Sequence, residues 1–85
     1  MSSTTTRTPT VEVWSQPACS GCQTAKQVLQ SRKIPYIEKL IGANGLTKQD
    51  LLAAVPDARS VPQIVVDGKP IGGLKELQEW IKWVQ

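Results

Sequence analysis

The sequence predicts an α/β domain in which three helices flank one mixed four-stranded sheet. Short runs rich in β-branched residues alternate with longer runs of helical periodicity, in the order β-α-β-α-β-β-α. Strand–helix–strand units favour parallel strands joined by a right-handed crossover. The last two strands are separated by the two-residue turn Asp67-Gly68, which makes that pair antiparallel.

The first strand and the first helix are predicted from residues 10–33. Residues 10–14 (TVEVW) are β-branched and aromatic, which is typical of a strand, and residues 15–18 interrupt it. A helix is expected from Ser20 to Arg32 or Lys33. Apolar side chains recur along it at spacings of three to four and form one face, which consists of Cys22, Ala25, Val28 and Leu29.

The second strand–helix unit follows. Residues 36–40 predict a strand, and residues 42–45 predict a loop. Thr47 is suited to cap the next helix, with Asp50 three residues later in a variant of the capping box. Pro56 marks the end of that helix. Its buried face is expected to consist of Leu51, Leu52 and Val55.

The remaining elements are a hairpin and a terminal helix. Residues 61–66 predict the third strand, and residues 69–71 predict the short return strand after the turn. Gly72-Gly73 ends the hairpin. The helix after it has an apolar face of Leu74, Leu77, Ile81 and Val84. We interpret Trp80 and Trp83 as side chains that cover the edge of the core, in preference to a partner surface.

Composition excludes several classes of protein. The net charge of +3 comes from scattered basic residues, which do not form the cluster that nucleic-acid binding requires. No apolar run approaches the ~18–20 residues of a membrane span. Residues 1–9 are Ser/Thr-rich without an apolar segment, so we expect a disordered tail there and one domain over residues 10–85. Two cysteines without a secretory signal favour a reducing, cytoplasmic compartment.

The chemistry of the chain is predicted by Cys19-Ser20-Gly21-Cys22, at the junction of a strand and a helix. A C-x-x-C beside a βαβ pattern is typical of thioredoxin-like redox proteins. Unpaired amides and the helix dipole favour a thiolate at the helix start, so the pKa of Cys19 is expected below that of a free thiol. Cys22 lies on the apolar face. We therefore predict Cys19 as the nucleophile and Cys22 as the resolving thiol.

The two cysteines allow two other interpretations. Half of a zinc site is one, but tetrahedral zinc needs four ligands and the chain has no His and no further Cys. A complete site would need a second chain. Two inert core cysteines are the other interpretation. It is disfavoured because Cys19 precedes the helix and lacks an apolar neighbourhood.

From about Thr10 to Val84 the chain resembles the glutaredoxin family, a branch of the thioredoxin-like superfamily. The resemblance depends on three motifs in order: Cys19-Ser20-Gly21-Cys22, Arg59-Ser60-Val61-Pro62 and Gly72-Gly73-Leu74-Lys75-Glu76-Leu77. It implies a thioredoxin-like (glutaredoxin) fold of the dithiol type, with a cis Val61–Pro62 bond facing the disulfide. Sequence alone would favour an ordinary proline at the start of a strand.

The resemblance also implies glutathione as co-substrate. Val61 would exchange backbone hydrogen bonds with the tripeptide, as an added strand would. The helix after Gly73 would attract the γ-glutamyl carboxylate, and Glu76 would hold the ammonium. The implied glutathione-binding residues are Gln16, Gln49, Arg59, Ser60, Val61, Pro62, Gly72, Gly73, Leu74, Lys75 and Glu76. For Gln49 and Arg59, a plain solvated surface is an equal alternative.

Three positions depart from the family pattern. Gln16 stands where the family usually has Lys or Arg, so one cation near the thiolate is missing, and Arg59 or Lys26 is a candidate to compensate for it. Gly21 replaces the common Tyr. Lys75 stands where a small polar or acidic residue is common.

We therefore predict an oxidoreductase that reduces protein disulfides and glutathione mixed disulfides. Ribonucleotide reductase is a client by family resemblance only, and a monomer without nucleic-acid or membrane partners is expected. One alternative is a redoxin reduced by thioredoxin reductase, which the missing cation at Gln16 favours. Another is a dimer that bridges a [2Fe–2S] cluster through Cys19 and glutathione; otherwise no metal is expected. A non-catalytic binding module is a third alternative.

Overall fold

The computed structural model describes residues 9–43 and 45–84, so the predicted tail lies outside the described residues except for Pro9. The predicted order of elements and the fold class are confirmed. The elements are β1 Val11–Ser15, α1 Ser20–Ser31, β2 Ile37–Leu40, α2 Lys48–Ala54, β3 Gln63–Val66, β4 Lys69–Gly72 and α3 Leu74–Val84.

The sheet has the strand order β2-β1-β3-β4. β1 and β2 are parallel, whereas β1–β3 and β3–β4 are antiparallel, as the connections predict. β3 begins at Gln63 and not at Val61. Pro62 has no amide hydrogen to donate to a strand ladder, so the regular pairing starts only after it.

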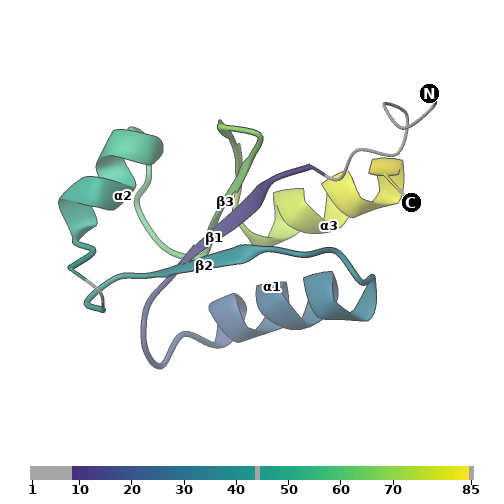
Figure 1. Ribbon diagram of the computed structural model, residues 1–85, viewed down its shortest axis with the longest axis horizontal. Helices are drawn as coiled ribbons and strands as arrows, with labels where there is room; N and C mark the ends of the chain where they lie inside the picture. The colour runs from purple at the N-terminus through teal and green to yellow at the C-terminus, as the bar shows by residue number, and fades with distance from the viewer. Residues whose placement is uncertain (1–8, 44, 85) are drawn as a thin grey trace.

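The two faces of the sheet are covered unequally. On one face, α1 and α3 pack against Val11, Val13 and Ile64, and this cluster is almost fully buried. On the other face, Trp14 and Val65 pack against Leu51 and Val55 of the α2 region. In Figure 1, α1 and α3 accordingly lie apart from α2, which stands at the left end of the view.

The capping prediction for α2 is confirmed. The hydroxyl of Thr47 accepts a hydrogen bond from the amide of Asp50 at 3.3 Å, and the carboxylate of Asp50 accepts from the amide of Thr47 at 2.7 Å. This is a complete capping box, which satisfies two amides at the start of the helix.

The two tryptophans of α3 differ in burial. Trp80 packs against the core cluster, as predicted. The prediction for Trp83 is wrong, because this side chain is 86% exposed. Leu77 and Ile81 form the buried stripe of the helix, and Trp83 lies two residues beyond Ile81, about 200° around the helix.

Candidate active site

The start of α1 is capped by a sulfur atom. Cys19 has an extended backbone, with φ −104° and ψ 108°, and its Sγ accepts a hydrogen bond from the amide of Cys22 at 3.1 Å. Ser, Thr or Asp usually supplies this acceptor. The first turn of α1 carries no acidic residue. A negative charge on this sulfur is therefore favoured by a helix-start amide and by the helix dipole.

Cys19 and Cys22 are joined as a disulfide, with their Cα atoms 5.2 Å apart. The side chain of Cys22 is 1% exposed, whereas Cys19 is half-buried. Cys19 is therefore the sulfur that an incoming substrate can reach. The division into nucleophile and resolving thiol stays a prediction, which this difference in burial favours.

Pro62 lies between the starts of α1 and α3. The Val61–Pro62 bond is cis, as the family resemblance implied. The Sγ of Cys19 lies 3.9 Å from the carbonyl oxygen of Val61. A methyl group at Gly21 would lie 3.2 Å from Cδ of Pro62, and one at Gly73 would lie 3.3 Å from its carbonyl oxygen. Both glycines permit this close approach.

The start of α3 is capped by the carboxylate of Glu76. Its Oε1 accepts a hydrogen bond from the amide of Gly73 at 2.9 Å. This bond is the main reason that the pKa of Glu76 is lowered. Gly72 has φ +124°, and a methyl group there would lie 2.6 Å from Cγ of Glu76. The amide of Gly73 is thus already bound to the chain's own carboxylate.

A polar pocket lies beside Val61, on the side of α2. It is lined by Gln16, Lys48, Leu51, Ala58, Arg59, Ser60 and Val61. Two of these side chains are cationic and none is acidic, so the pocket suits an anionic group. Four predicted residues line it, namely Gln16, Arg59, Ser60 and Val61. Sequence analysis missed Lys48, although a basic residue beside the helix cap at Thr47 was a visible signal.

Other predicted residues lie elsewhere. Gln49 is exposed on α2 and is not among the residues that line the pocket. Lys75 is exposed on α3. Leu74 is half-buried and packs against the core cluster.

Of the two candidates to replace the cation missing at Gln16, the structure brings only Arg59 to the pocket. The ammonium of Lys26 is instead paired with the carboxylate of Glu38 at 2.8 Å.

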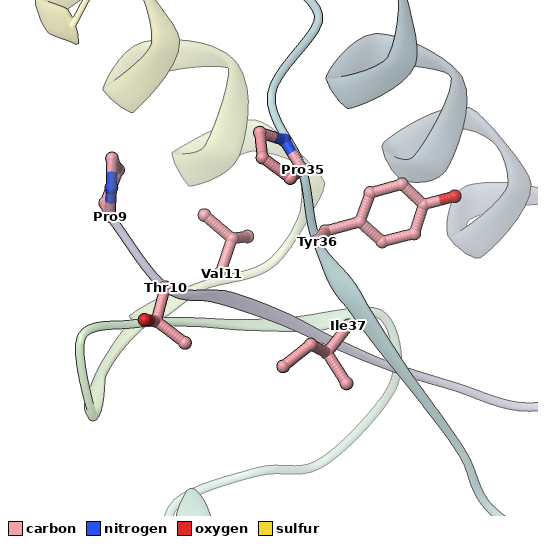
Figure 2. A pocket seen from close by; sticks show the side chains of 6 residues that line it. All are labelled: Pro9, Thr10, Val11, Pro35, Tyr36 and Ile37. Atoms are coloured by element: carbon pink, nitrogen blue, oxygen red, sulfur yellow. The ribbon is translucent and has the colours of Figure 1, made fainter. Parts of the chain in front are cut away.

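A second hollow lies where β1 and β2 begin, away from the cysteines. It is lined by Pro9, Thr10, Val11, Pro35, Tyr36 and Ile37. Figure 2 shows the ring of Tyr36 pointing toward α1. Its hydroxyl accepts a hydrogen bond from Nε2 of Gln30 on that helix at 2.9 Å. The lining offers no thiol and no charged side chain, so this hollow is not the redox site.

Residues 9–43 and 45–84 lack two further features. No group of three or more His, Cys, Asp or Glu side chains in this part of the chain is placed to hold a metal ion. No helix within it is long and apolar enough to cross a membrane.

Comparisons with known proteins agree with this geometry. The sequence model of the family described as Glutaredoxin matches residues 11–71. The chain is 35% identical over 78 residues to a glutaredoxin of Haemophilus influenzae. This match covers 85% of this chain and 90% of the relative. The reduced glutaredoxin of Escherichia coli matches with TM-score 0.72 and 31% identity, over 87% and 94% of the chains. A buckwheat glutaredoxin matches with TM-score 0.74 and 22% identity, and the match covers 89% of this chain and 71% of the buckwheat chain.

Proposed function

The chain belongs to the glutaredoxin family and is a thiol–disulfide oxidoreductase, and from this premise we propose that glutathione is its electron donor. The observation that carries the proposal is the cationic pocket lined by Val61, whose carbonyl oxygen lies 3.9 Å from the sulfur of Cys19. The buckwheat relative was solved as a complex with glutathione, which supports the same ligand for this chain.

The tripeptide is expected to lie across the cis-proline segment with its sulfur at Cys19. The backbone of Val61 pairs with it as a strand does, and Lys48 and Arg59 attract its glycine carboxylate. Since Glu76 holds the amide of Gly73, the γ-glutamyl carboxylate is expected at the amides of Leu74 and Lys75. These are the first residues of α3, so their amides have no intrahelical acceptor.

The proposed reaction is a series of thiol–disulfide exchanges. The Cys19 thiolate attacks a substrate disulfide, forms a mixed disulfide and releases one substrate thiolate. Cys22 then attacks the sulfur of Cys19, which releases the second substrate thiolate and forms the Cys19–Cys22 disulfide. Glutathione attacks that disulfide, and a second glutathione displaces the first as glutathione disulfide.

Glutathionylated proteins need only Cys19. The thiolate accepts the glutathione from the protein thiol, and a second glutathione removes it as glutathione disulfide. Proteins with disulfides or glutathionylated thiols are therefore the proposed substrates, with ribonucleotide reductase as one candidate. A monomer in the reducing cytoplasm is the proposed working state.

The test is an assay of NADPH oxidation coupled through glutathione and glutathione reductase, with a glutathione mixed disulfide as substrate. We expect activity in the wild type and in Cys22→Ser, and none in Cys19→Ser. Lys48→Gln is expected to raise the glutathione KM about two- to fivefold, the range of an exposed ion pair. Lys69→Gln, which removes the same charge from the start of β4, serves as its matched control.

Two outcomes would contradict glutathione as donor. Activity only when thioredoxin reductase replaces glutathione and its reductase would identify the alternative donor. A coloured dimer after anaerobic reconstitution with iron and sulfide, without reductase activity, would favour the cluster-bridging alternative.

A further inference from the structure

A hydrogen-bond network joins β1, β2 and α1 behind the cysteine pair. Oε2 of Glu38 on β2 accepts from Nζ of Lys26 on α1 at 2.8 Å and from Oγ of Ser15 on β1 at 2.9 Å. The side chains of Lys26 and Glu38 are 16% and 35% exposed. Ser15 is 1% exposed, and among residues 9–43 and 45–84 it is the only polar residue that is buried. None of the three is needed for the glutathione contacts proposed above.

The network lies close to Cys22. Lys26 follows Cys22 by four residues on α1, and side chains with this spacing are neighbours, about 5–6 Å apart at Cβ. Ser15 is the last residue of β1, and it shares with Val11 and Val13 the sheet face that α1 covers. Because α1 begins shortly after β1 ends, its first turns lie over this end of the strand.

We propose that the Lys26–Glu38 ion pair is a positioning and tuning element that sets the proton affinity and the reduction potential of the Cys19–Cys22 couple. Reduction of the disulfide to one thiolate and one thiol consumes two electrons and one proton. The ammonium of Lys26 stabilises the thiolate, and the carboxylate of Glu38 opposes this effect while it holds the ammonium in place. Ser15 orients the carboxylate from the buried side.

The neighbours of Glu38 on β2 and its partner on β1 bring no further charge to the face on which it lies. On β2, Lys39 points to the opposite face of the sheet from Glu38, since successive side chains alternate. Tyr36 shares the face of Glu38, and its hydroxyl is bound by Gln30. The residue paired with Glu38 on β1 is Val13, which is uncharged. The hydrogen bonds from Lys26 and Ser15 lower the pKa of Glu38, so the carboxylate is charged at neutral pH.

The test compares Glu38→Gln, Lys26→Met and the double variant in the full chain. The thiolate of the reduced protein is titrated by its ultraviolet absorbance, and the potential is measured by equilibration with dithiothreitol. Glu38→Gln is expected to lower the thiolate pKa by about half a unit and to make the couple more oxidising. Lys26→Met is expected to raise the pKa by a similar amount, and the double variant should return toward the wild type.

The two single variants are expected to shift the thiolate pKa in opposite directions, and this difference distinguishes electrostatic tuning from loss of structure. If the pair only fastens α1 to β2, both single variants will shift the pKa and the potential in the same direction, which overturns the proposal. No shift in either variant also overturns it. Lys69→Met is the charge-matched control and is expected to leave both quantities unchanged. Because dithiothreitol is the reductant, these results do not depend on whether glutathione is the donor.

Discussion

The starts of α1 and α3 lie on either side of Pro62 and are capped by different atoms. At α1, the sulfur of Cys19 precedes the helix and accepts from the amide of Cys22. At α3, the carboxylate of Glu76 reaches back from the first turn to the amide of Gly73. In α1 the residue at the N-cap position, Cys19, supplies the acceptor. In α3 the acceptor comes from a residue three positions after Gly73, which is half of a capping box.

The difference explains why one helix start is reactive and the other is structural. The sulfur of Cys19 passes between disulfide, thiol and thiolate, so its hydrogen bond and charge change with the redox state. The carboxylate of Glu76 is charged at neutral pH, as any glutamate is, and the amide of Gly73 lowers its pKa further. A similar backbone arrangement therefore provides chemistry at α1 and a permanent cap at α3.

The largest expected effect separates the two roles of Cys19. Cys19→Ser should abolish reductase activity, by at least about a thousandfold, because the oxygen does not exchange with disulfides. The hydroxyl still caps the helix, so stability should stay near that of the reduced wild type. Cys19→Ala removes the cap as well and should cost about 1 kcal/mol. Urea denaturation of the reduced proteins measures the difference, and equal stability of the two variants would contradict a capping role.

An intermediate effect is expected where the backbone makes room for Glu76. Gly42 and Gly72 both have positive φ, +96° and +124°, and only Gly72 has a neighbour within reach of an added methyl group. Gly42→Ala should cost about 1–3 kcal/mol of unfolding free energy from backbone strain alone. Gly72→Ala should cost more, because the methyl group displaces the side chain of Glu76.

The matched control is a double-mutant cycle with Glu76→Ala, measured by urea denaturation. The excess cost of Gly72→Ala over Gly42→Ala should disappear in the Glu76→Ala background. An excess that persists there would show that the carboxylate is not what the methyl group displaces.

The smallest effect is the acid dependence of the α3 cap. The folded-state pKa of Glu76 lies below its ordinary value of 4.5, so the contribution is fully present above that value. It is lost as the pH falls through the lower folded-state pKa. The difference in urea midpoint between wild type and Glu76→Gln should therefore be constant near neutral pH and vanish in acid. A difference that grows in acid would contradict the sign of this linkage.

Local sequence signals were sufficient for the elements and the redox pair. The apolar periodicity of residues 20–33, the capping pair Thr47 and Asp50, and the Asp67-Gly68 turn each depend on neighbours along the chain. The C-x-x-C spacing likewise brings two sulfurs together within one helical turn. The sequence by itself therefore determined the fold class and the chemistry.

Only the tertiary structure decided which side chains surround that chemistry. It brings Lys48 and not Gln49 to the pocket beside Val61, and it pairs Lys26 with Glu38. It also leaves Trp83 exposed. These outcomes depend on helix rotation and on contacts between residues distant in sequence. Polar surface positions carry no periodic signal from which such contacts can be predicted.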